Sequence, residues 1–346
     1  MNHPRCWRTL GWALMLGTLF GSVALAADAP AADPRIGMRV VTKAPKMKLK
    51  VGENDVVTGD EQVVYKVTRL NGPWFWVVAG DVGGWVPQDD VVPFDQAIDY
   101  FTDQIRSHPQ NAWLFQMRGL IWYDRKDYDR AISDYIEAAA LDPKDATSYH
   151  NLGNAWLAKR EYDNAINDYN EATNLDPKDT ASYYHRALAW VAKRELSLAI
   201  ADYNEAIRLD PKDPLKHRNR GLAWAAAHEY GPALADFAEV VKLDPTDALA
   251  FNGQGWIMAT CPDAKFRDGK KAVESATRAC ELRGWKEPYF LGTLAASYAE
   301  AGDFDAAVKW QTQALSLFPK DDQDRNGHRR RLTLYQAKKT YQDSSP

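Results

Sequence analysis

One pattern recurs four times between residues 112 and 245, at a fixed spacing of 34 residues. In every copy an alanine is followed four positions later by an aromatic residue. These pairs are Ala131 and Tyr135, Ala165 and Tyr169, Ala199 and Tyr203, and Ala233 and Phe237. Tryptophan, a small residue and proline recur at the same spacing. A period of this length with these residue types predicts a helical repeat whose units stack on one another.

Each copy predicts two antiparallel helices, which in the first copy run from about residue 112 to 123 and from about 128 to 140. Gly119 lets the two helices approach closely, while Ala131 and Ala138 present small faces to the neighbouring helix. Pro143 ends the unit because proline cannot continue the helix that it follows. The chain is therefore predicted to be mainly α-helical.

The second copy is close to the consensus of the tetratricopeptide repeat (TPR). Its residues at the consensus places are Tyr149, Leu152, Gly153, Trp156, Tyr162, Ala165, Tyr169, Ala172 and Pro177. The chain resembles this family over roughly two thirds of its length, which implies a right-handed α-solenoid of helix pairs. The stretch from Ala259 to Leu282 resembles a tail unit found at the end of many bacterial TPR proteins.

The repeat pattern continues on both sides of the four copies. Our predicted boundaries are a capping helix at 94–109, four regular units at 112–247, two further units at 248–321, and a C-terminal capping helix and tail at 322–346. The first of the two further units carries an insertion around 261–268. Capping elements are expected because the end units of a solenoid must cover their apolar faces.

Residues 35–93 have the pattern of short strands instead. Leu49 lies between Lys48 and Lys50, and turns are predicted at Asn71-Gly72 and at 81–84. Five short strands in about sixty residues suggest a small all-β barrel. The segments 65–67, 72–74 and 84–86 resemble bacterial SH3-like domains, some of which bind cell-wall peptides, glycans or proteins. Trp74, Trp76 and Trp85 could form such a surface, but we favour a core or half-core role.

The first 26 residues are predicted to be a cleavable signal peptide. Arg5 and Arg8 form a basic start, an apolar run follows, and Ala24-Leu25-Ala26 gives a cleavage site. Residues 27–34 form a flexible lead after it. We expect a periplasmic or secreted protein with no transmembrane segment after cleavage, and the alternative is an uncleaved N-terminal membrane anchor.

Charge and motifs argue against several function classes. Removal of the signal moves the formal net charge from −4 to −6, which gives little electrostatic basis for nucleic-acid binding. Gly269-Lys270-Lys271 lacks the glycine frame of a phosphate-binding loop, and His150 and His185 lack the local spacing of a metal pair. The chain is therefore predicted to be non-enzymatic, with no catalytic residue, cofactor or metal.

A TPR solenoid uses its first helices to line a concave groove. We expect the groove to be lined by residues that packing within each unit does not use. These are Trp113, Gln116, Leu120, Tyr123, His150, Asn154, Tyr184, Leu188, Arg218 and Leu222. Such a mixed surface suits an extended peptide or a helix of a partner protein. Of the lysine–asparagine set that clamps C-terminal carboxylates in some members, only Asn154 matches.

The copies also carry charges that can pair within a unit. Arginine replaces the usual leucine at Arg118, Arg186 and Arg220, and every copy has an aspartate on its second helix. We predict structural ion pairs, with a charged ladder for a partner as the alternative. The predicted ion-pair residues are Arg118, Asp134, Arg186, Asp202, Arg220 and Asp236.

Three cysteines occur, and Cys6 leaves with the signal. Cys261 and Cys280 fall in one unit, where either a disulfide or two buried thiols are compatible with the sequence. In an exported protein a disulfide would stabilise the loop by about 3 kcal/mol.

Together these features favour a non-enzymatic scaffold of the bacterial envelope that binds a partner protein in the TPR groove. The alternative is a cell-wall binding module, in which the SH3-like domain grips peptidoglycan and the TPR array recruits other proteins. The sequence leaves the oligomeric state open.

Overall fold

The computed structural model describes residues 33–45, 48–51, 54–57, 64–80, 82–319 and 322–343. The predicted signal peptide at 1–26 and most of the predicted lead at 27–34 lie outside these residues. The described chain divides into two compact units, an N-terminal unit that ends at Ala189 and a C-terminal unit that begins at Trp190. The division falls inside helix α6 (Thr180–Ala192), and the two units are described separately.

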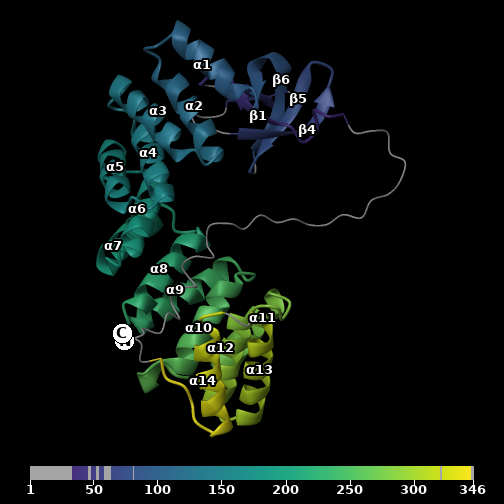
Figure 1. The fold of residues 1–346 in the computed structure, drawn as a ribbon, viewed down its shortest axis with the longest axis vertical. Helices are drawn as coiled ribbons and strands as arrows, with labels where there is room; N and C mark the ends of the chain where they lie inside the picture. Colours follow the sequence, from purple (N-terminus) through teal and green to yellow (C-terminus); the bar gives the residue numbers. More distant parts are fainter. Residues whose placement is uncertain are drawn as a thin grey trace. The chain divides into compact units, whose positions relative to one another are not determined.

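The N-terminal unit begins with one antiparallel sheet in the order β3-β2-β6-β5-β4-β1-β7 (Figure 1). Its strands are β1 (Arg39–Thr42), β2 (Lys48–Val51), β3 (Asn54–Val57), β4 (Val64–Asn71), β5 (Trp74–Ala79), β6 (Val82–Pro87) and β7 (Val91–Pro93), with a short 3-10 turn, η2 (Gln88–Asp90), before β7. The described residues thus form seven strands where five were predicted. Short strands lie at the two edges of the sheet, β3 and β2 at one edge and β1 and β7 at the other. The sequence pattern alone did not resolve all of them as individual strands.

Side chains alternate between the two faces of the sheet. Phe75 and Val77 point into a core with Val67, whereas Trp76 stays half-buried between them. Trp76 lies opposite Trp85 on the neighbouring strand, and their rings meet edge to face at 5.3 Å. The tryptophans therefore pack on each other on the outer face of the sheet.

The sheet covers the end of the first helices. Val41 and Val92 share a buried cluster with Phe101 of α1 (Ala97–Ser107) and with Met117 of α2 (Ala112–Asp124). The Arg39 guanidinium also donates two hydrogen bonds, of 2.8 and 2.6 Å, to the carboxylate of Asp124. Apolar burial and this paired contact join the β region to the helical array.

The helices follow as pairs joined by short turns (Figure 1). The N-terminal unit continues with α3 (Tyr128–Leu141), α4 (Ala146–Lys159), α5 (Tyr162–Leu175) and the first part of α6. The C-terminal unit contains α7 (Leu196–Leu209), α8 (Pro214–Ala226), α9 (Tyr230–Leu243), α10 (Ala248–Thr260), α11 (Gly269–Leu282), α12 (Pro288–Glu300), α13 (Phe304–Leu317) and α14 (Arg325–Gln336). In the described part of the chain, every helix is too short or too polar to cross a membrane.

Glycine at the small position permits close packing within a pair. A Cβ atom added to Gly119 would lie 2.7 Å from the Tyr135 ring, and one added to Gly153 would lie 2.6 Å from the Tyr169 ring. Both tyrosines are fully buried. The aromatic residue of the second helix therefore packs on the backbone of the first helix at this point.

The turn after the first helix of each of the four regular units contains a residue with left-handed backbone geometry. These residues are Lys126, Arg160, Arg194 and His228, with φ between 60° and 66°. Their spacing of 34 shows that each repeat ends its first helix in the same way.

The last units depart from this regularity. The insertion after α10 contains the 3-10 turn η3 (Ala264–Phe266), and Arg267 ties it down by donating to Glu300 at 2.9 Å and to the Cys261 carbonyl at 2.8 Å. Helix α14, in the stretch predicted as a C-terminal capping helix and tail, ends at Gln336, and Lys338 then turns the chain at a φ of 54°. Arg331 of α14 is buried although it carries a charge.

Candidate functional site

Gln116 does not face an open groove. Its side chain is buried, and its amide donates to the Ser148 hydroxyl at 2.7 Å and to the Asp145 carboxylate. Asp145 also caps α4 by accepting from the backbone of Ser148 at 3.0 Å. This corrects the prediction for Gln116, which holds the start of the next first helix.

His150 occupies the equivalent place one repeat later. Its Nδ1 atom lies 2.7 Å from the Ser182 hydroxyl and 3.5 Å from the Asp179 carboxylate. Burial alone would raise the pKa of Asp179, but hydrogen bonds from His150 and Ser182 lower it to about 2. His150 therefore also links two repeats.

Arg218 makes the same connection in the C-terminal unit. It donates to Asp247 at 2.5 Å, and Asp247 caps α10 by accepting from the backbone of Ala250 at 2.9 Å. We call Gln116–Asp145, His150–Asp179 and Arg218–Asp247 the inter-repeat rungs. Each joins residues 29 positions apart, a spacing that the sequence contains and that the groove prediction overlooked.

The other predicted groove residues keep part of their surface exposed. Trp113, Leu120, Tyr123 and Leu188 of the N-terminal unit and Leu222 of the C-terminal unit are half-buried. Asn154 accepts a hydrogen bond from the Tyr169 hydroxyl at 2.7 Å. Tyr184 is half-buried and packs edge to face on His185 at 5.3 Å.

His185 itself lies among aromatic rings. Burial first, and then the charge of His150, lower the pKa of His185 to about 4. The imidazole is therefore neutral at physiological pH.

Two of the predicted ion pairs form within their units. Arg118 donates to both carboxylate oxygens of Asp134, at 2.9 and 2.7 Å, and also to the Thr102 hydroxyl at 3.1 Å. Arg220 does the same with Asp236, at 2.9 and 2.6 Å, and donates to Asn204 at 2.7 Å. Each guanidinium thus bridges two second helices, as expected of a structural pair rather than of a ladder that binds a partner.

Arg186 has the equivalent contact with the preceding second helix, since it donates to Asn170 at 2.7 Å and to Thr173 at 2.9 Å. Asp202 is buried on α7. Because Arg186 lies in the N-terminal compact unit and Asp202 in the C-terminal one, their pairing stays a prediction.

The second repeat lacks this arrangement. Leu152 stands where the other three regular repeats have arginine, so Asp168 lies on α5 without a guanidinium from its own first helix. Burial raises the pKa of Asp168 to about 7, while a hydrogen bond from Trp156 acts in the opposite direction. The sequence showed the missing arginine but did not reveal its effect on the acid.

The two cysteines do not form the disulfide considered from the sequence. Both are buried free thiols, and they belong to different clusters. Cys261 packs with Phe237 and Ile257, whereas Cys280 packs with Leu291 and Leu294. Burial raises the pKa of the Cys280 thiol to about 12.

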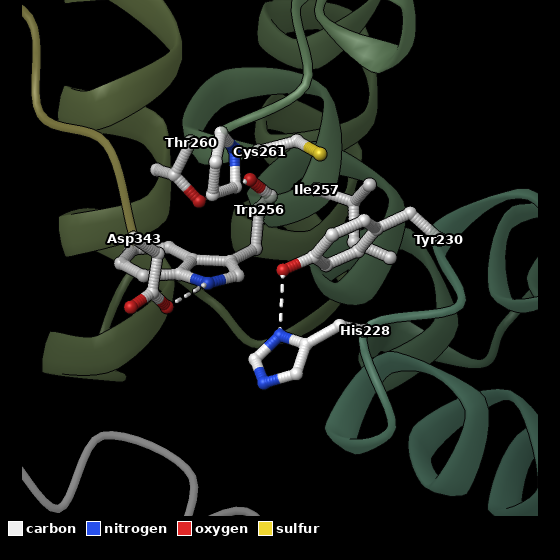
Figure 2. A pocket seen from close by; sticks show the side chains of 8 residues that line it. His228, Tyr230, Trp256, Ile257, Thr260, Cys261 and Asp343 are labelled. Carbon is white, nitrogen blue, oxygen red and sulfur yellow. Dashed lines mark hydrogen bonds between the residues drawn. The ribbon is translucent and has the colours of Figure 1, made fainter. Parts of the chain in front are cut away.

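A pocket of the C-terminal unit lies where the end of the described chain returns to α10. Its lining residues are His228, Tyr230, Trp256, Ile257, Thr260, Cys261, Pro262 and Asp343. Figure 2 shows the Asp343 carboxylate pointing at the Trp256 indole, whose N–H donates to it at 3.1 Å. On the opposite side, His228 Nδ1 lies 2.9 Å from the Tyr230 hydroxyl.

The segment that ends at Asp343 has further contacts with α10 and α14. The backbone N–H of Asp343 donates to the Thr260 carbonyl at 2.8 Å. The Tyr341 ring lies 6.0 Å from the Trp256 ring, and the Arg331 guanidinium lies 5.4 Å from the centre of each. We call residues 341–343 the docked segment.

Family models match three stretches of this chain. Residues 119–159 match a model described as TPR repeat, and residues 150–214 and 289–321 match models described as tetratricopeptide repeat. The helix pairs with Gly119, Tyr135 and their copies agree with these matches. These units are tetratricopeptide repeats.

Solved structures share the fold of this TPR protein. The C-terminal part of a TPR repeat-containing protein from Cytophaga hutchinsonii is 19% identical, with a TM-score of 0.55 over 68% of this chain and 94% of its own length. One chain of the APC/C hetero-tetramer Cut9–Hcn1 is 15% identical, with a TM-score of 0.51 over 69% of this chain and 46% of that chain. No curated protein sequence matches significantly. The matching models are all repeat models and indicate no enzymatic family.

Trp256 occupies a recurring place in the TPR units. It lies 34 residues after Leu222, in the series Leu120, Asn154, Leu188, Leu222 and Trp256. The fixed spacing could therefore have added Trp256 to the predicted binding residues. The docked segment carried no such signal, because it does not belong to a repeat. Among the described residues, no cluster of three or more histidine, cysteine, aspartate or glutamate side chains is arranged to hold a metal ion.

Proposed function

We propose that this TPR protein is a non-enzymatic scaffold of the bacterial envelope that binds a peptide or helix of a partner protein along its first helices. The basic, apolar and small-residue pattern of residues 1–26 supports export. A second part of the proposal is that the β region is SH3-like and serves as a packed end of the array.

One observation carries the proposal. The first helix α10 binds an irregular segment of the same chain. The segment is held by a backbone hydrogen bond from Asp343 to Thr260 and by a hydrogen bond from the Trp256 indole to the Asp343 carboxylate. Leu120, Leu188 and Leu222 occupy the same place in other repeats and are half-buried. Equivalent places on stacked first helices are the surface on which TPR arrays can bind a partner chain.

The rungs narrow the choice of residues to test. Gln116, His150 and Arg218 hold neighbouring repeats together, so their replacement would disturb the array itself. Leu120 and Leu222 make none of the rung bonds. They are therefore the better positions at which to block a partner.

The experiment compares capture of envelope proteins by two double variants. Leu120→Lys with Leu222→Lys introduces charge on first helices, and Ile136→Lys with Leu198→Lys introduces the same charge on second helices, where these residues are 48% and 46% exposed. We expect the first variant to lose specific partners that the second retains. Equal capture by both variants and the wild type would overturn the proposal.

A further inference from the structure

The docked segment lies on a first helix, at the repeat position for which partner binding is proposed above. Trp256 is the fifth member of the series that contains Leu120, Leu188 and Leu222. The contact with Asp343 joins residues 87 positions apart. The end of the described chain thus returns to α10 after the helices α11, α12, α13 and α14.

Three features of the contact are chemically selective. The Trp256 indole N–H is a donor only, so it selects an acceptor such as the Asp343 carboxylate. The ring of Trp256 and the Arg331 guanidinium both lie near the Tyr341 ring, which selects an aromatic side chain. The Thr260 carbonyl accepts from the backbone of Asp343 and fixes the position of the segment.

The residue between the two anchors is different. Gln342 is exposed, whereas Asp343 is 7% exposed and Tyr341 is half-buried. The contact therefore selects an aromatic residue and an acid two positions later, and it places no requirement on the residue between them.

We propose that the surface around Trp256 is a binding site for a partner segment with an aromatic residue followed two positions later by an acid, and that the docked segment occupies it until such a partner displaces it. This inference rests on the proposed function, since it names the ligand chemistry of one first-helix place. In the structure residues 341–343 occupy this site, so they compete with any partner segment that binds there.

The ends of α14 allow the segment to leave without unfolding the helix. Helix α14 closes at Gln336, and Lys338 turns the chain in a left-handed conformation. Lys338 and Lys339 are exposed between the helix and the docked segment. Undocking then breaks the contacts of residues 341–343 only, and it loosens the connection that carries these two exposed lysines, at which trypsin cleaves.

The test uses the full chain and an amidated, fluorescein-labelled peptide with the sequence of residues 337–343. In the double variant Tyr341→Ala with Asp343→Asn the site should be vacant, so we expect the peptide to bind about tenfold more tightly than to the wild type. Gln342→Ala, in the same segment, should behave as the wild type. Adding Trp256→Phe to the double variant removes the indole donor and should weaken peptide binding by about fivefold.

A second measurement detects undocking even if the affinity of the labelled peptide is too weak to measure. Trypsin cleavage after Lys338 and Lys339, followed by mass spectrometry, should be about fivefold faster in the double variant than in the wild type and in Gln342→Ala. Equal peptide binding and equal cleavage in wild type and double variant would overturn the inference. So would a dimeric wild type that becomes monomeric in the double variant, because the segment would then dock on a second copy.

These results separate the inference from the proposed function. If the peptide and cleavage tests contradict the inference, the effect of the Leu120 and Leu222 substitutions on partner capture can still be measured. Conversely, equal capture by the Leu120–Leu222 and Ile136–Leu198 variants leaves binding of the labelled peptide measurable.

Discussion

The first and second TPR units place an aspartate at the same point and surround it differently. Asp134 accepts two hydrogen bonds from Arg118. In the second unit Leu152 occupies the place of Arg118, so Asp168 has no equivalent arginine. Burial raises the pKa of both acids. The Arg118 guanidinium opposes this shift for Asp134, whereas the pKa of Asp168 reaches about 7. The same repeated acid is therefore paired with a guanidinium in one copy, and it titrates near neutral pH in the next.

The largest effect should come from making the first unit resemble the second. Arg118→Leu leaves the buried Asp134 without its guanidinium, and we expect a loss of about 2 to 3 kcal/mol of unfolding free energy at pH 7. Urea unfolding followed by circular dichroism measures it. Arg106→Leu, which removes an ion pair with 74% and 69% exposed side chains, should cost less than about 0.5 kcal/mol. Equal losses in both variants would contradict the comparison.

Asp168→Asn should stabilise the protein at and above neutral pH. The pKa of Asp168 is about 7 in the folded state against an ordinary value of 3.8 in the unfolded chain, so the folded state binds more protons between these pH values. Its contribution to stability therefore falls as pH rises from about 4 to 7 and stays low above 7. Because the group is partly exposed, we expect a gain of only about 1 kcal/mol at pH 8.

Unfolding curves of wild type and Asp168→Asn at pH 5 and pH 8 check this prediction. The difference between the two proteins should be larger at pH 8. Asp305→Asn, an exposed acid of α13, is the matched control and should show no such dependence. A gain that is the same at both pH values would sink the titration argument.

Leu152→Arg should give the second unit the ion pair of the first. The added guanidinium should lower the pKa of Asp168 into the acidic range, where NMR titration of its carboxyl carbon can follow it. Loss of the buried leucine contacts offsets the new pair, so the net change in stability should stay within about 1 kcal/mol. A carboxyl that still titrates near 7 would show that the arginine does not reach it.

The smallest effect should come from exchanging one rung residue for another. His150→Gln places in the second unit the amide that bonds Ser148 and Asp145 in the first, so we expect a change below about 0.5 kcal/mol. His150→Ala removes the rung and should cost about 1 to 2 kcal/mol. Thermal unfolding of the two variants, side by side, makes the comparison, and equal losses would mean that the rung is unimportant.

The sequence predicted the fold well where the chain repeats itself. The spacing of Ala131, Tyr135 and their copies defines the helix pairs because packing imposes the same small and large residues on every unit. The same logic gave Arg118–Asp134 and Arg220–Asp236, whose partners lie within one unit.

The candidate site was harder to predict, for two physical reasons. Gln116 and His150 were assigned to the groove because a polar side chain on a first helix looks exposed when its partner is a helix cap in the next unit. The contact of Asp343 with Trp256 links non-repeating residues, and no periodicity encodes it.

The turns with positive φ have a consequence for engineering. Lys126, Arg160, Arg194 and His228 hold a left-handed conformation that side chains with a Cβ atom adopt at a steric cost. Glycine adopts it freely, and after its greater freedom in the unfolded chain is subtracted, each replacement should still gain a few tenths to about 1 kcal/mol. His228 also contacts the Tyr230 hydroxyl and lines the pocket that holds Asp343. Lys126, Arg160 and Arg194 lie in separate repeats and outside the helices, so replacing these three with glycine should raise the thermostability of the array without touching that pocket.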